Sequence, residues 1–100
     1  MHARIATYEL TGGTADEIVD VVQDGLLSIF QRSPGFVRYG VVVPGDGTVL
    51  SLSLWGSRPD AERAVADAAD FVRDHLADKV RLMANAVGDL AFFEGARSSL

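Results

Sequence analysis

Apolar and polar side chains roughly alternate over Ala3–Leu10, which is the period of an extended strand. Its two faces carry Ile5, Thr7 and Glu9 and, opposite them, Arg4, Ala6, Tyr8 and Leu10. The alternation stops at Thr11–Gly13, and Thr14 is followed three residues later by Glu17. This spacing is a capping box, in which the two side chains satisfy free backbone N–H groups at a helix start. The pattern predicts a strand and then a helix that begins at Thr14.

The predicted helix is amphipathic. Apolar residues recur at three- and four-residue steps from Ile18 to Ile29, while acidic residues lie mostly elsewhere on the helical wheel. Ser33–Gly35 ends this pattern, because proline disfavours a helical residue before it and glycine admits a turn. We therefore expect one helix between Thr14 and Ser33, buried along one face.

A hairpin follows the helix. Pro44–Gly47 is a dense turn signal between Phe36–Val43 and Thr48–Trp55, both of which read as strands. The strand Thr48–Trp55 has a strict two-residue period. One face carries Leu50, Leu52 and Leu54, and the other carries Ser51, Ser53 and Trp55. We expect the leucine face to lie beneath the helices.

A second helix is predicted after this hairpin. Ser57 can cap it, and Pro59 lies in the first turn, where its missing N–H would have been unpaired in any case. Apolar residues keep helical spacing down to about Ala84, a length that suits either one long helix or two segments joined near Asp70.

The last strand is expected over Val87–Glu94. Asn85 or Gly88 can end the helix before it, and Leu90 and two phenylalanines favour extended structure. Gly95–Leu100 is predicted to be a short tail.

The order strand, helix, strand, strand, helix, strand predicts an α+β fold. Right-handed crossovers place both helices on one face of a four-stranded antiparallel sheet, the ferredoxin-like βαββαβ arrangement. The other face would present Val or Phe of the outer strands beside Trp55, a patch that a monomer rarely leaves wet. A second copy related by two-fold symmetry would cover it, giving a homodimeric α+β barrel.

Composition narrows the function classes. The 100 residues suit a single domain spanning 1–100, and 48% hydrophobic with 23% charged residues is ordinary for a globular protein. No apolar run approaches the ~20 residues of a membrane span, and the start lacks a secretory pattern. We therefore expect a cytoplasmic protein with no membrane contact. The net charge of −5 with scattered basic residues argues against nucleic-acid binding.

Few side chains suit metal or cofactor chemistry. The chain has no cysteine, no glycine-rich phosphate loop and no paired histidines at metal-ligand spacing, so we expect neither a metal nor a cofactor. His2 is expected in solvent at the chain start. His75 lies among charged residues beside the apolar stripe of the second helix and is expected on the surface.

Aromatic and polar strand residues are the remaining candidates. Trp55 could wall a pocket for a flat aromatic ligand, with Ser53 on the same face, or could fill the core or a dimer interface. Its place before Gly56 lets it turn toward either face. Tyr8 and Tyr39 could orient or protonate a phenolic substrate, although strand tyrosines also serve packing.

Arg38 is a further substrate-binding candidate. If a partner covers its face, the guanidinium needs a ligand anion or a carboxylate, for which Asp89 of a second subunit is suitable. The two predicted strands are the sheet edges, so such a pair could form only between subunits. A solvated Arg38 is the alternative.

Two segments resemble the antibiotic biosynthesis monooxygenase-type family: Ser33–Phe36 and Ser53–Ala61. The similarity in order and spacing extends over residues 3–94. Members are dimeric α+β barrels, and many oxidise polycyclic aromatic substrates with molecular oxygen and without metal or flavin. Trp55 matches a pocket position of the family. Ala6–Thr7 and Val65–Ala66 stand where haem-degrading relatives present an asparagine and a histidine, so no haem-degrading role is implied.

Three functional readings result. In the first, a cofactor-independent monooxygenase-like protein uses Trp55 with Tyr8 or Tyr39 to line a pocket for a small or polycyclic aromatic substrate. In the second, a non-catalytic dimeric module binds a small apolar ligand or a protein. The third is an isomerase or cyclase whose base is His75 or Asp89. The first predicts an apolar cavity between sheet and helices, and the second predicts none.

Overall fold

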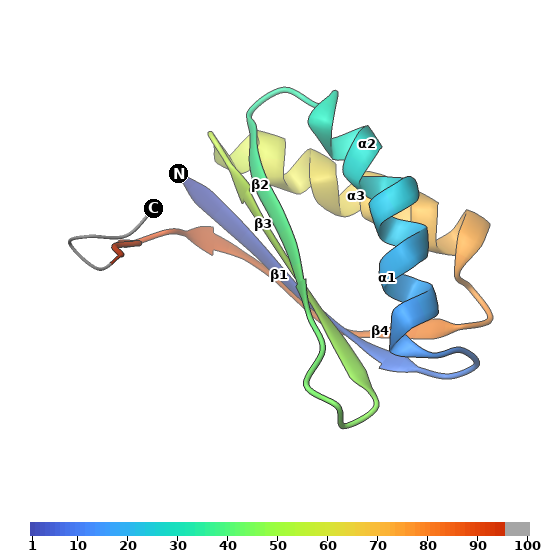
Figure 1. The fold of residues 1–100 in the computed structure, drawn as a ribbon. Coiled ribbons are helices and arrows are strands. Elements are labelled where there is room, and N and C mark those ends of the chain that lie inside the picture. Colours follow the sequence, from blue (N-terminus) through green and yellow to red (C-terminus); the bar gives the residue numbers. More distant parts are fainter. Residues whose placement is uncertain (96–100) are drawn as a thin grey trace.

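A computed structural model describes residues 1–95. Its elements are β1 (His2–Leu10), α1 (Ala15–Asp24), α2 (Leu26–Gln31), β2 (Phe36–Val42), β3 (Thr48–Trp55), α3 (Arg58–His75) and β4 (Val80–Asp89). The strands form one antiparallel sheet in the order β2-β3-β1-β4, and all three helices pack on the same face of it (Figure 1). The predicted ferredoxin-like fold is confirmed. Residues 96–100 of the expected tail lie outside the described part of the chain.

The first helix begins as predicted but is interrupted. The Thr14 side chain caps α1 by accepting a hydrogen bond from the Glu17 backbone N–H at 3.2 Å. At Gly25 the backbone is distorted, with φ at −117° and ψ at −68°, and α2 starts at the next residue. A Cβ atom at Gly25 would lie 2.5 Å from Cε2 of Phe71, so α3 passes too close for any larger residue. The single helix expected up to Ser33 is therefore two helices.

The second helix is shorter than predicted, and the last strand begins earlier. Ser57 caps α3, and the helix runs unbroken past Asp70 to His75. A turn closed by Lys79 and Val80 backbone N–H groups on the Leu76 carbonyl then leads into β4. The helical spacing down to Ala84 was misleading. Residues 80–84 are extended because they pair with β1, and the local sequence does not reveal this pairing. The strand predicted over Val87–Glu94 is correspondingly misplaced, and Asn85 and Gly88 lie within β4 rather than at a helix end.

The two faces of β3 are the reverse of the expectation. Ser51, Ser53 and Trp55 are buried beneath the helices, opposite Ala6, Arg4 and His2 of β1. The leucines face the other side, together with Ile5, which pairs with Leu52. Within residues 1–95 no helix covers that face (Figure 1), although Leu54 at its end is only 5% exposed. The reason is size: two serines leave room for the helices to approach, and the one large side chain, Trp55, fills the space beyond them.

A register shift in β2 separates residues that simple alternation would group. Phe36 pairs with Trp55, and after an irregularity Arg38 pairs with Leu54. Phe36 therefore packs on the helix side, whereas Arg38 and Val42 lie on the uncovered face. The sequence predicted a patch of Val or Phe beside Trp55 on the face away from the helices. This prediction is wrong for Phe36 and for Trp55, which both lie on the helix side.

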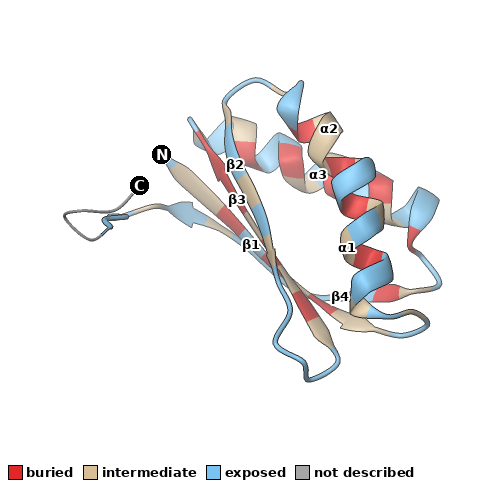
Figure 2. Cartoon of the chain, viewed as in Figure 1, coloured by how far each residue is buried: buried red, intermediate tan, exposed pale blue. Residues whose placement is uncertain are grey.

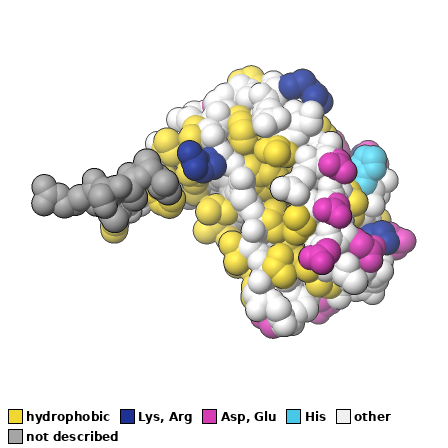
Figure 3. Space-filling view, viewed as in Figure 1, with side chains coloured by type: hydrophobic (Ala, Val, Ile, Leu, Met, Phe, Trp, Pro, Cys, Tyr) yellow, Lys and Arg dark blue, Asp and Glu magenta, His cyan; other side chains and the backbone are white. Residues whose placement is uncertain are grey.

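The core lies between the helices and the sheet (Figure 2). Phe30, Trp55 and Leu76 are its largest fully buried apolar side chains. Small residues of α3, among them Ala61 and Ala68, bring that helix close to the sheet. Acidic side chains gather over α1, while hydrophobic side chains are exposed over β2 and between it and the helices (Figure 3). None of the helices in residues 1–95 combines the length and apolar character needed to cross a bilayer.

Candidate functional site

A small cavity lies between the sheet and the helical layer. Its volume is about 20 Å³, and its lining residues come from α1, α2, α3 and all four strands: Tyr8, Ile18, Val22, Leu26, Tyr39, Val41, Val49, Ser51, Val72, Leu76 and Val80. Only two tyrosines and one serine are polar, so the cavity is apolar with a few hydroxyl groups. This volume accommodates one water-sized molecule.

An open groove adjoins the cavity at the β2 edge of the sheet. The groove has a volume of about 140 Å³ and runs between β2 and the α1–α2 helices. It shares Val22, Tyr39 and Val41 with the cavity, so these three side chains separate the two spaces. A cavity of about 150 Å³ is enough to bind benzene. The groove therefore has room for one aromatic ring, with Tyr39 between that ring and the cavity.

The Tyr39 hydroxyl has a shifted pKa. Burial raises the pKa of its hydroxyl, and this outweighs the lowering by a hydrogen bond with Ser51. The neighbouring Tyr8 also raises that pKa, and the Arg4 charge lowers it. A tyrosine whose pKa is raised keeps its proton at neutral pH. Tyr39 can therefore donate a hydrogen bond or a proton to a bound oxygen atom, but it does not act as a base.

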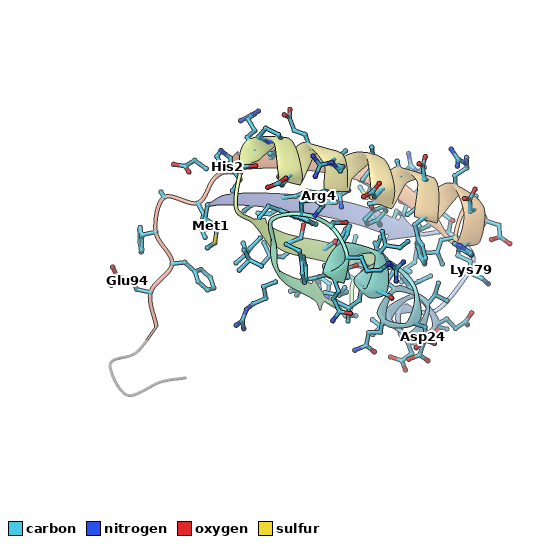
Figure 4. All side chains as sticks on the ribbon, turned by 90° about the horizontal axis from the view of Figure 1, so that it is seen from above. Met1, His2, Arg4, Asp24, Lys79 and Glu94 are labelled. Carbon is cyan, nitrogen blue, oxygen red and sulfur yellow. The ribbon has the colours of Figure 1, made fainter. Side chains whose placement is uncertain are left out.

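A buried arginine lies behind the tyrosines. Arg4 projects from β1 into the space between sheet and helices and is only 2% exposed (Figure 4). Its Nε donates to Oδ1 of Asn85 at 2.8 Å, and its Nη2 donates to the Tyr8 hydroxyl at 3.3 Å. None of the ion pairs between described residues involves Arg4. Sequence reasoning missed this residue, although Arg4 shares its face with Ala6 and Tyr8, and a charge at an inward position of a strand is the available signal.

Trp55 and Ser53 lie beside the cavity without lining it. The indole is fully buried, and its Nε1 donates to the Ser53 hydroxyl at 2.9 Å. Its ring meets Phe30 edge-on at 5.1 Å between centroids, and Phe30 meets Tyr39 in the same way at 5.0 Å. An aromatic chain therefore connects Trp55 to the cavity wall. Substrate contact by Trp55 or Ser53 stays a prediction.

The remaining candidates do not converge on the cavity. Arg38 is exposed on the uncovered sheet face, and Asp89 lies at the far edge of the sheet on β4. His75 is exposed at the end of α3, with its ring 4.6 Å from that of Phe71. His75 ends α3, before the turn into β4, and Asp89 ends β4, a 10-residue strand that is roughly 30 Å long at the usual rise per residue. They do not form one site.

His2 differs from the expectation of a solvated residue. It belongs to β1, pairs with Trp55 and Asp89 on either side, and is half-buried. Its Nδ1 is buried and has no hydrogen-bond partner among residues 1–95. Strand pairing at the very start of the chain removes this side chain from solvent.

Together these groups favour binding of an oxygen atom. Tyr8 and Tyr39 line an apolar space, and the Arg4 guanidinium donates a hydrogen bond to the Tyr8 hydroxyl. Within residues 1–95 no three His, Asp or Glu side chains lie close enough together to hold a metal ion.

Comparison with solved structures identifies the same fold in several proteins. SnoaB, a cofactor-independent oxygenase from Streptomyces nogalater, is similar with a TM-score of 0.68 at 16% identity, over 98% of this chain and 97% of SnoaB. HapK from Hahella chejuensis is similar with a TM-score of 0.71 at 16% identity, over 96% of this chain and 99% of HapK.

A Chloroflexus aurantiacus J-10-fl protein provisionally assigned as an antibiotic biosynthesis monooxygenase is similar with a TM-score of 0.68 at 16% identity, over 94% of this chain and 96% of that one. No family model and no curated protein matches the sequence. The structural neighbours thus include antibiotic biosynthesis monooxygenase-type proteins, as the sequence resemblance predicted. At such identities the likeness shows a shared fold.

Proposed function

We propose that this protein is a cofactor-independent monooxygenase-like enzyme that acts on a small or polycyclic aromatic substrate. The observation that carries the proposal is the apolar cavity between sheet and helices, which is lined by Tyr8 and Tyr39. The fold that this chain shares with SnoaB, a cofactor-independent oxygenase, supports it.

The substrate itself supplies the electrons in this reaction. A ring CH₂ group flanked by aromatic rings loses one proton to solvent, and the resulting carbanion forms a C–O bond with O₂. The peroxide anion takes up a proton from solvent, and the resulting hydroperoxide loses the second C–H proton while its O–O bond breaks. The products are a carbonyl group and hydroxide, which takes up a proton to become water. Tyr39, whose raised pKa keeps its hydroxyl protonated, donates a hydrogen bond to the peroxide and gives the departing hydroxide its proton, which solvent then replaces.

Substrate entry requires movement of the helical layer. A polycyclic ring system exceeds both the cavity of about 20 Å³ and the groove of about 140 Å³. Val22, Tyr39 and Val41 separate these two spaces, and displacing α1 from β2 would merge them. The interruption at Gly25 lets α1 move separately from α2.

The proposal includes a homodimer. The uncovered sheet face exposes Ile5 by 48% and Val42 by 55%, beside the leucines of β3. A monomer would leave this apolar face in water, and a second copy with the same face would cover it. An ion pair between Arg38 and the Asp89 of a second subunit remains part of this proposal. A cytoplasmic location stays the expectation from the sequence.

Anthrone is a suitable first substrate, because it carries such a CH₂ group between two aromatic rings. We expect oxygen uptake of one O₂ per anthrone converted to the quinone, measured with an oxygen electrode and by quinone absorbance. Tyr39→Phe removes the proton donor and should lower the rate by at least about tenfold, since general acid catalysis contributes about 10²–10⁴. His75→Gln is the matched control and should leave the rate unchanged, whereas an isomerase or cyclase relying on that histidine would lose activity.

A second candidate is a non-catalytic module that binds a small apolar ligand or a protein. The small volume of the cavity and the close packing of the alanines of α3 favour it. Fluorescence of Trp55, the chain's one tryptophan, distinguishes the two functions. Quenching by anthrone without oxygen uptake would support the module. The absence of both quenching and oxygen uptake would rule out an aromatic pocket.

A further inference from the structure

The charge of Arg4 is not neutralised by any ion pair of the described chain. The side chain is 98% buried, being 2% exposed, and both of its hydrogen-bond partners are neutral groups. Burying a charged group without an opposite charge is costly, because the interior replaces only part of its hydration. The other charged side chains that form described ion pairs lie at or near the surface. Arg4 differs from them because it is both buried and without an ion pair, and this needs an explanation.

One of the two hydrogen bonds of Arg4 reaches a residue that lines the cavity, and the other reaches Asn85 beside a separate groove. Asn85 accepts from Nε and holds the guanidinium in place, and the Tyr8 hydroxyl accepts from Nη2. Because Tyr8 accepts this bond from a cation, its own proton is free to be donated and is a stronger donor. Tyr8 lines the cavity, as does the Ser51 hydroxyl. A ligand oxygen in the cavity would accept a hydrogen bond from the Tyr8 hydroxyl, and the positive charge of Arg4 would strengthen that bond.

We propose that Arg4, acting through the Tyr8 hydroxyl, makes the cavity a receptor for an ionised oxygen, so that the protein selects ligands that carry an acidic phenol or enol. The inference rests on the proposed aromatic site and specifies its substrate class. The anionic oxygen of the ligand supplies the counter-charge that Arg4 lacks. Arg4 is a positioning residue in this arrangement, because Tyr8 stands between it and the ligand.

An open groove on the other side of Arg4 offers a competing route. This groove lies between α3 and β4, has a volume of about 380 Å³, and is lined by Arg58, Glu62, Val65, Asn85 and Val87. Asn85 stands between the groove and the guanidinium. At the rim Glu62 forms an ion pair with Arg58 at 3.8 Å, so the two charges offset each other and give an anion no net attraction. The cavity side, with hydroxyl donors and no carboxylate among its lining residues, suits an anionic oxygen better.

The probe is 4-nitrophenol, which titrates near neutrality and has separate absorption bands for phenol and phenolate. Its pKa is measured by absorbance against pH, free and with saturating protein. We expect the bound phenol to have a pKa at least about one unit lower, equivalent to about tenfold tighter binding of the phenolate than of the phenol. Arg4→Met keeps the length of the side chain without the charge and should abolish the shift, and Arg4→Lys should restore part of it.

4-Nitroanisole is the matched control ligand, because it has the same ring and no ionisable oxygen. In the wild-type protein it should bind at least about tenfold more weakly than the phenolate, a comparison that needs no variant. Arg4→Met should leave anisole binding unchanged, which also shows that the variant folds. Tyr8→Phe should abolish the pKa shift, since it removes the group that transmits the charge.

The outcomes separate the two proposals. If both nitro compounds bind equally and the phenol pKa is unshifted, the aromatic site stands and the anion receptor is wrong. If neither compound binds, both are wrong. A shift that survives Tyr8→Phe would overturn the assigned path through Tyr8. A shift in nitrophenol with no oxygen uptake on anthrone would support the anion receptor and reject the oxygenase.

Discussion

At the scale of single residues, hydrogen-bond partners and burial decide which candidates can act. Trp55 was the leading candidate in the sequence, yet its N–H is bonded to Ser53 and its ring is enclosed by Phe30 and Phe36. Tyr39 has its hydroxyl at the cavity and its pKa raised by burial. Side-chain identity alone did not distinguish the surroundings of Trp55 from those of Tyr39, because both are aromatic strand residues with one polar group.

The raised pKa of Tyr39 makes folding stability depend on pH in the alkaline range. Below the ordinary tyrosine value of 10.0 both folded and unfolded chains hold the proton, so this group's contribution is complete. As pH rises above 10.0 the unfolded chain loses the proton first, and stability falls until the folded pKa is passed. Tyr39→Phe should therefore lose less stability between about pH 9 and pH 11.

Urea unfolding across this pH range measures the effect. The wild-type midpoint should fall more steeply than that of Tyr39→Phe, because lysine, arginine and Tyr8 titration is common to both proteins. Parallel curves would show that burial of Tyr39 does not perturb its ionisation.

At the scale of elements, contacts between segments changed boundaries that local patterns had predicted. Local signals were enough for the start of α1 and for β3, where capping and strict alternation leave no alternative. They were insufficient at Gly25, where the Phe71 ring leaves no room for a side chain, and at Val80, where pairing with β1 extends residues 80–84. Both corrections come from residues distant in the sequence.

Gly25→Ala tests the close approach of α3. In an isolated helix this change would help by about 1 kcal/mol, because glycine is a poor helix former. Here the new Cβ would lie 2.5 Å from the Phe71 ring, which is itself buried. We expect a net loss of about 1–3 kcal/mol in the free energy of unfolding, measured in urea.

The same substitution in a Phe71→Leu background is the control. Removing the ring atoms that meet the Cβ should make Gly25→Ala clearly less harmful there than in the wild type. Equal losses in both backgrounds would mean that the interruption has another cause.

At the scale of the whole molecule, an apolar sheet face is left without cover by the described chain. The leucine row of β3 and Ile5 of β1 lie side by side on this face, opposite the side that holds the cavity. Sequence parity identified two kinds of face but assigned them to the wrong sides. The face that meets the helices carries the small polar side chains of Ser51 and Ser53, so polarity alone did not distinguish inside from outside.

Ile5→Glu tests the dimer. In a dimer the new carboxylate would be buried at the interface without a partner, whereas in a monomer it would meet water. We expect the wild type to sediment as a dimer at micromolar concentration and Ile5→Glu to sediment as a monomer. Ala77→Glu, which adds the same charge in the exposed turn after α3, should leave the dimer intact. A wild-type protein that sediments as a monomer would contradict the homodimer.

The sequence by itself determined the element order, and with it the fold, because capping boxes, turn residues and two-residue alternation are local and act within a few positions. The tertiary structure decided which face of β3 meets the helices, where α1 and β4 begin or end, and that Arg4 lies buried behind Tyr8. The physical reason is range. Propensity acts between neighbours in the chain, whereas a buried charge, a shared cavity and a strand partner are defined only when distant segments pack together.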